Sequence, residues 1–64
     1  MELDSNFFKT ARMRFPMAWS DYSFGRIDLH QFLKILALGL FMEQDTTSFL
    51  AQEVRKGLLD LGDQ

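Results

Sequence analysis

Apolar and polar positions in the second half of the chain recur with helical spacing. Asp28, followed three residues later by Gln31, is typical of a capping box and predicts that a helix begins there and runs over about 29–44. A short polar segment follows, and a second helix is predicted over about 48–61. Four of its large apolar residues share one stripe: Leu50, Val54, Leu58 and Leu61. The pattern therefore predicts a helical hairpin over 28–64.

The first of these helices is apolar on every side over eight consecutive residues, from Ile35 to Met42. A helix of this kind has to be covered on most of its faces. The second helix covers one face, and the first 27 residues cover part of another. We therefore expect the remaining face to be covered by a second copy of the chain or by another protein, so that the fold is oligomeric or belongs to a larger assembly.

The first 27 residues are compatible with two structures. In one of them, a half-buried strand covers 11–19 and a second short strand covers 22–27. Pro16 would confine the first strand to a sheet edge, because proline has no N–H to donate. The period-2 pattern that predicts this strand consists of Ala11, Met13, Phe15, Met17 and Trp19.

In the other structure, the same segment begins as a short helix. Asp4 or Ser5 caps this helix, which ends before Pro16 because the residue before a proline disfavours helical geometry. Three apolar side chains then share one helical face: Phe8, Ala11 and Phe15. The predicted fold class is thus mostly α, a helical hairpin with an irregular or short β or helical N-terminal segment.

Length and charge are consistent with one small domain. The chain has 64 residues, of which 47% are hydrophobic, and a net charge of −2, which predicts a single folded domain over 1–64. Residues 1–27 are rich in basic and aromatic side chains, whereas 28–64 are acidic. A fold of this size buries a limited core and has no cysteine for a disulfide, so self-association is the expected source of extra stability.

No segment of the sequence predicts a membrane span. A spanning helix needs about 20 apolar residues, and the longest apolar run here has eight. The N-terminal residues include Glu2 and Asp4 where a secretory signal carries basic residues. We therefore expect a cytoplasmic protein with no membrane partner.

The residue types of the chain give little reason to expect catalysis. Nucleophilic catalysis pairs an activated nucleophile with a base, but the chain has no cysteine and one histidine, His30. The four glycines are scattered, whereas a phosphate-binding loop needs them clustered before a helix. We expect a protein that is not an enzyme and that carries no metal or cofactor.

Binding to another protein, to a second copy of the chain, or to both is the function that the sequence favours. The apolar helix would supply buried contact area, and aromatic and arginine side chains anchor many interfaces. A regulator, adaptor, inhibitor or accessory subunit would act in this way. The candidate contact residues are Arg12, Arg14, Trp19, Phe41 and Met42.

A dimeric DNA-binding regulator is the alternative. A strand over 22–27, a helix, a short polar turn and a second helix together resemble the layout of the ribbon-helix-helix repressors. In that family, the paired strands of two chains enter the major groove, and the second helix begins near phosphates. The resemblance implies base contacts from Tyr22, Phe24 and Arg26 and backbone contacts from Thr46, Thr47 and Ser48.

Overall fold

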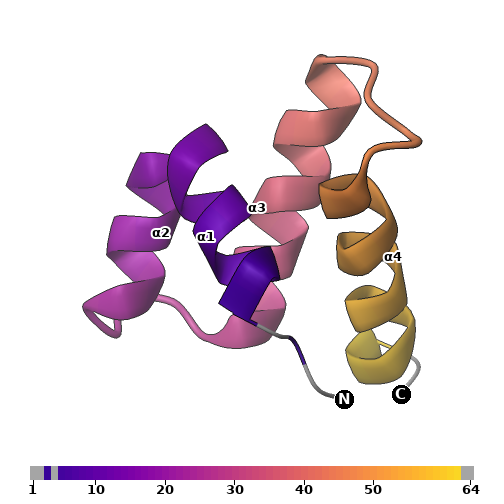
Figure 1. Ribbon diagram of the computed structural model, residues 1–64. Coiled ribbons are helices and arrows are strands. Elements are labelled where there is room, and N and C mark those ends of the chain that lie inside the picture. Colours follow the sequence, from indigo (N-terminus) through magenta and orange to yellow (C-terminus); the bar gives the residue numbers. More distant parts are fainter. Residues whose placement is uncertain (1–2, 4, 63–64) are drawn as a thin grey trace.

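Helices make up most of the described part of the protein (Figure 1). The computed structural model describes residue 3 and residues 5–62, and within them the chain forms four helices and no strand. The helices are α1 (Ser5–Arg14), α2 (Pro16–Ser23), α3 (Leu29–Met42) and α4 (Phe49–Gly62). α1 packs against α2 and α4, and α3 packs against the same two helices. The prediction of a mostly helical protein is therefore confirmed.

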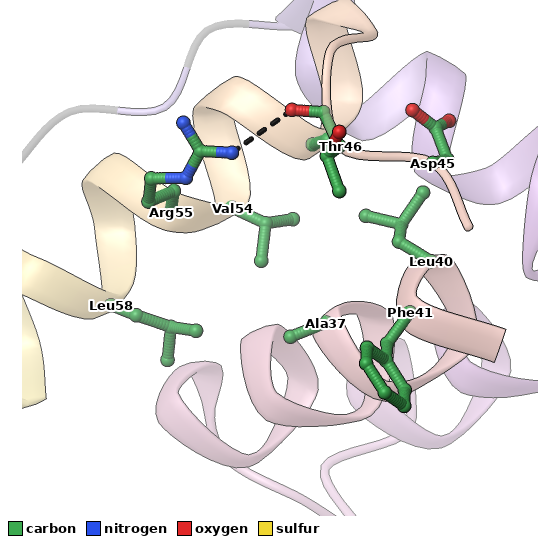
Figure 2. A pocket seen from close by; sticks show the side chains of 9 residues that line it. Ala37, Leu40, Phe41, Asp45, Thr46, Val54, Arg55 and Leu58 are labelled. Carbon is green, nitrogen blue, oxygen red and sulfur yellow. Dashed lines mark hydrogen bonds between the residues drawn. The ribbon is translucent and has the colours of Figure 1, made fainter. Parts of the chain in front are cut away.

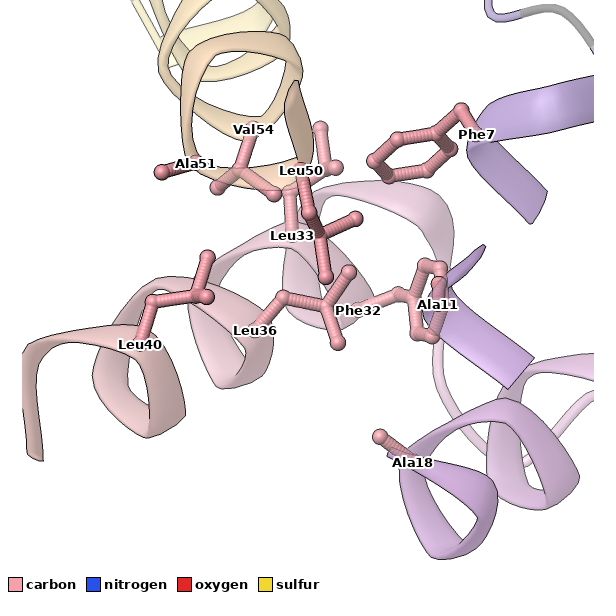
Figure 3. Close-up of a cluster of buried hydrophobic side chains, with 10 residues drawn as sticks. All are labelled: Phe7, Ala11, Ala18, Phe32, Leu33, Leu36, Leu40, Leu50, Ala51 and Val54. Carbon is pink, nitrogen blue, oxygen red and sulfur yellow. The ribbon is translucent and has the colours of Figure 1, made fainter. Parts of the chain in front are cut away.

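The core lies where α1, α3 and α4 meet (Figure 3). Figure 3 shows Phe7 of α1 pointing toward Leu50 of α4, and both side chains are fully buried. α3 lies at the centre because it supplies the largest share of the buried side chains: Phe32, Leu33, Leu36 and Leu40. These residues recur at helical spacing, so one face of α3 is fully used by the chain's own core.

The predicted helical hairpin is confirmed, and so is the capping box that begins it. The Gln31 N–H donates to the Asp28 carboxylate at 2.8 Å, and the Asp28 N–H donates to the Gln31 side-chain oxygen at 3.2 Å. These two bonds satisfy N–H groups that a helix start otherwise leaves open. α3 ends at Met42, two residues before the predicted boundary.

The strand predicted across Pro16 is wrong, and a short helix forms there as in the helical alternative. Its predicted face is only partly correct, because Ala11 is buried but Phe8 and Phe15 are half-buried. Of the two predicted caps, Ser5 is the first residue of the helix, and Asp4 lies outside the described residues.

α1 buries Phe7 and Ala11, which are one helical turn apart, and it ends before Pro16. Pro16 then occupies the first position of α2, where a missing N–H leaves no hydrogen bond unmade. The alternating pattern misled because Met13 and Met17 are each 82% exposed and contribute nothing to a buried face.

The second predicted strand, over 22–27, is also wrong. α2 continues through Tyr22, and the chain then turns at Gly25, whose φ of 80° favours glycine. The Gly25 N–H donates to the Tyr22 carbonyl at 3.1 Å, and the Arg26 N–H donates to the Asp21 carbonyl at 2.9 Å. Paired bonds of this kind form a Schellman motif, which ends a helix. The described residues therefore contain no ribbon of the ribbon-helix-helix type.

Aromatic rings fill the space between α1, α2 and the first half of α3. Tyr22 stacks on Phe32, with ring centroids 4.7 Å apart, and also on Phe8, at 6.2 Å. Trp19 packs against the same rings, at 5.7 Å from Phe8 and 6.1 Å from Phe32. This aromatic cluster holds α2, a helix of eight residues, against the rest of the fold.

Phe15, in the corner between α1 and α2, lies against the backbone of α3 at Gly39. A β-carbon added at Gly39 would clash with the Phe15 ring. Glycine at this position of α3 therefore permits this close approach. The contact holds the α1–α2 corner beside the C-terminal half of α3.

Candidate functional site

The solvent-facing side of α3 is polar in its first half and apolar in its second half. Gln31 and Lys34 are exposed in the first half. From Ile35 to the end of the helix every exposed side chain is apolar: Ile35, Leu38, Phe41 and Met42. Phe41 and Met42 are each 73% exposed, and Leu38 is 62% exposed. We refer to these four residues as the outward apolar face.

An open groove of about 220 Å³ runs beside this face, between α3 and α4 (Figure 2). Figure 2 shows Ala37 and Leu40 of α3 and Val54 and Leu58 of α4 pointing into the space between the two helices. Phe41 and Ala51 complete the apolar lining, and the polar groups come from Asp45, Thr46 and Arg55. An apolar hollow with a few polar groups is the composition that suits an apolar side chain of a ligand or partner.

The α3–α4 groove and the outward apolar face are continuous. Phe41 and Thr46 line the groove, and they also line a second hollow together with Met42 and Gln44. The two hollows are therefore neighbours across the Phe41 side chain. A contiguous apolar surface of this kind is a common mark of a protein interaction site.

The turn that borders both hollows ends α3 with the same motif that ends α2, but without glycine. The Gln44 N–H donates to the Phe41 carbonyl, and the Asp45 N–H donates to the Leu40 carbonyl, both at 2.9 Å. Gln44 has a φ of 58°. A residue with a side chain pays about 1 kcal/mol for this left-handed conformation, so other contacts have to hold the turn.

Arg14 of α1 supplies such a contact. Its guanidinium donates to the Asp45 carboxylate at 2.8 Å and also to the Glu43 carboxylate. The hydrogen bond from Arg14, followed by those from Ser48, lowers the pKa of Asp45 from 3.8 to about 2. The pKa of Arg14 is raised, chiefly by its bond to Asp45. The ion pairs therefore persist at neutral pH and tie the end of α3 to α1.

Two further bonds fix the other side of this turn. The Ser48 hydroxyl accepts the Ala51 N–H at 3.1 Å and so caps the start of α4. Arg55 of α4 donates to the Thr46 carbonyl at 2.9 Å, the dashed line in Figure 2. The border of the groove is thus held in place before any partner arrives, which reduces the entropy lost on binding.

The structure places the five predicted protein-contact residues in different settings. Phe41 and Met42 lie on the outward apolar face. Arg14 reaches the turn directly after them through its ion pairs. Trp19 is half-buried in the aromatic cluster near the start of α3, and Arg12 is exposed on α1. The structure therefore brings together three of the five, at the C-terminal end of α3.

The six residues predicted for DNA contact lie at opposite ends of α3 (Figure 1). Phe24 and Arg26 are exposed in the turn before α3, where Arg26 pairs with Asp21 at 3.2 Å. Tyr22 is half-buried in the aromatic cluster. Because α3 has 14 residues, it separates the two turns by about 20 Å. The remaining three candidates lie in the turn after α3: Thr46, Thr47 and Ser48.

The groove itself was not predicted. The sequence pattern predicts a core stripe that includes Val54 and Leu58, and it predicts no site at Ala37 or Ala51. The only signal in the sequence is that the two alanines are small, so that they leave space in the lining of the groove. Which residues face each other depends on how the two helices cross, and a single helical pattern does not contain that information.

The described residues offer neither a metal site nor a membrane-spanning helix. Among residue 3 and residues 5–62, no three His, Asp or Glu side chains gather closely enough to hold a metal ion. None of the helices in that range combines the length and the apolar character that a membrane crossing requires. Comparisons with protein-family models, with curated proteins and with solved structures find no significant match to this chain. Its function has to be inferred from its own geometry.

Proposed function

We propose that this protein is a small, non-catalytic protein-binding module whose docking site is the outward apolar face of α3 together with the α3–α4 groove. The observation that carries the proposal is the exposure of Phe41 and Met42 beside an apolar groove. Covering a large apolar side chain contributes about 1.5–3 kcal/mol. A regulator, adaptor, inhibitor or accessory subunit would gain its affinity in this way.

The geometry favours a partner that offers an apolar helix or segment. One large side chain of the partner would enter the groove between Ala37 and Val54, and its neighbours would cover Phe41 and Met42. Arg55 stands at the same groove as the positively charged group. A partner with a carboxylate beside its apolar anchor would therefore match the site in charge as well.

Site-specific photo-crosslinking tests this proposal in the cells that make the protein. A photoreactive phenylalanine analogue replaces Phe41 in one variant and Phe24 in the control. The two positions are matched, because Phe41 is 73% exposed and Phe24 is 74% exposed. We expect one discrete protein adduct from position 41 and none at the same mass from position 24.

Calorimetry with the identified and purified partner completes the test. Phe41→Ala is expected to weaken binding by about 30-fold or more, as for a central anchor residue. Phe24→Ala should leave the affinity unchanged. Equal adducts from both positions, or equal losses in both variants, would contradict the proposal. Duplex DNA that binds the protein and is released by Arg26→Gln would instead support the DNA-binding alternative.

A further inference from the structure

The two ends of the outward apolar face differ in charge. Between Lys34 and Glu43, α3 contains no charged residue. Lys34 is exposed at one end, and at the other end Glu43 and Asp45 share the single guanidinium of Arg14. The face is therefore an uncharged apolar strip with a positive end and an end that carries an excess of negative charge.

We propose that the occupant of this face is a second copy of the chain, bound antiparallel about a two-fold axis near Leu38. This inference rests on the proposed function and names the partner of the same surface. It predicts an isologous homodimer in which the same residues of both copies form the contact.

Helix geometry makes the face complementary to itself. Ile35, Leu38 and Met42 are separated by three and four residues, so they form one line along α3. Ile35 lies about 4.5 Å before Leu38 along the axis, and Met42 lies about 6 Å after it. With the two-fold axis at Leu38, this residue meets Leu38 of the second copy, and Ile35 meets Met42 of the second copy. Each large side chain then faces another large side chain.

Charge selects the antiparallel orientation. When the two helices run in opposite directions, the end of α3 that carries Lys34 lies at the end of the other copy that carries Glu43 and Asp45, so ends of unlike charge meet. The helix dipoles are also opposed in that arrangement. A parallel pair would place Lys34 beside Lys34 and the carboxylates beside one another, which is unfavourable.

Size favours a second copy and also sets the expected affinity. A 64-residue chain without cysteine has few other means of extending its apolar core. The four exposed side chains offer on the order of 400 Å² of apolar surface per copy. Two copies with their neighbouring polar groups would bury about 1,000 Å², the lower limit for a specific interface. We therefore expect a dimer with a dissociation constant in the micromolar range.

Sedimentation velocity over a concentration series of about 1 to 500 µM tests the dimer. The wild-type protein should pass from monomer to dimer across this range. Leu38→Glu places like charges at the two-fold axis and should raise the dissociation constant by at least about tenfold. Leu59→Glu on α4 is the matched control, because Leu59 is 67% exposed and Leu38 is 62% exposed. It should dimerise like the wild type.

A wild-type protein that stays monomeric throughout the series would overturn the homodimer, as would a Leu38→Glu variant that dimerises normally. The proposed function has its own readout, the binding of the identified crosslinked partner. A monomer whose partner binding depends on Phe41 would therefore refute the homodimer and leave the docking function intact. If the crosslinked partner is the chain itself, both proposals are supported.

Disulfide trapping tests the orientation and does not depend on the charged variant. The chain has no cysteine, so introduced thiols report only their own positions. A mixture of Ile35→Cys and Met42→Cys proteins should form a mixed disulfide dimer on mild oxidation. Ile35→Cys alone should remain largely unlinked. Efficient linkage of Ile35→Cys to itself would show a parallel pair and overturn the proposed arrangement.

Discussion

The two faces of α3 have nearly the same composition but very different surroundings. Each face has one phenylalanine and three aliphatic or methionine side chains. The inward residues are exposed by 3% or less: Phe32, Leu33, Leu36 and Leu40. The outward residues are exposed by 41% to 73%: Ile35, Leu38, Phe41 and Met42. Hydrophobicity thus indicates that a side chain favours burial, but the neighbouring helices decide whether its own chain provides it.

The largest effect is expected from shortening an inward residue. Leu36→Ala removes a fully buried side chain from the centre of the core and should lower the free energy of unfolding by about 2–5 kcal/mol. A 64-residue domain has about 3–10 kcal/mol in total, so this variant should lose a large part of its stability. Urea titration followed by circular dichroism measures the loss. A decrease below about 1 kcal/mol would contradict the close packing of the inward face.

This contrast also explains how far the sequence could be interpreted. The hairpin was predictable because Asp28 and Gln31 begin a helix through local hydrogen bonds. The uncovered face of α3 was predictable in kind, because a helix apolar on all sides exceeds what one neighbour can bury. The N-terminal half was ambiguous because Met13 and Met17, which are apolar but exposed, imitated the alternation of a strand.

The candidate site was predictable only in part, for a related reason. Phe41 and Met42 could be named because they end an apolar run. The groove beside them is lined by Ala37 of α3 and Ala51 of α4, and tertiary packing decides which residues of the two helices line it. Arg14 was expected to contact a partner, yet its structural partners are Glu43 and Asp45, about 30 positions away in sequence.

The boundary between the two faces can be tested at Gly39. Gly39→Ala gains about 1 kcal/mol in helix propensity, but the added methyl group meets the Phe15 ring. Overpacking of this kind typically costs 1–3 kcal/mol, so we expect a net loss of about 1 kcal/mol in unfolding free energy. Combining it with Phe15→Ala should reverse the sign of the Gly39→Ala effect. The double-mutant cycle contradicts the contact if the two changes are additive.

The turn at the end of the outward face can be stabilised by a change at Gln44. Gln44→Gly relieves the left-handed conformation of a residue with a side chain and should raise the free energy of unfolding by somewhat less than about 1 kcal/mol. Gly25→Gln is the converse change in the equivalent turn before α3, where open space surrounds the glycine. It should lower the stability by a similar amount. The thermal unfolding midpoints of both variants test this prediction. Midpoints that shift in the same direction would show that the left-handed conformation does not determine the two effects.

The ion pairs at the same end of α3 predict a pH dependence in acid. The pKa of Asp45 is about 2 in the folded protein and 3.8 ordinarily, so between these values the unfolded chain binds a proton that the folded chain does not. Stability from this carboxylate is therefore complete above about pH 4 and is lost as the pH falls toward 2. Arg14→Gln should reduce this part of the acid loss. Urea midpoints measured from neutral pH to acid would show it, and an unchanged slope would argue against the pair.

The smallest effect on stability is expected at Leu38, which is a leucine of α3 like Leu36 but lies on the outward face. Leu38→Ala should change the free energy of unfolding of the dilute monomer by less than about 0.5 kcal/mol, because the side chain is largely exposed. The same change should weaken self-association at high concentration, since it removes apolar contact area at the two-fold axis. A loss above about 1.5 kcal/mol in dilute solution would show that Leu38 supports the monomer's own core. The outward face would then belong to the fold, as the inward face does, and would not be free for a partner.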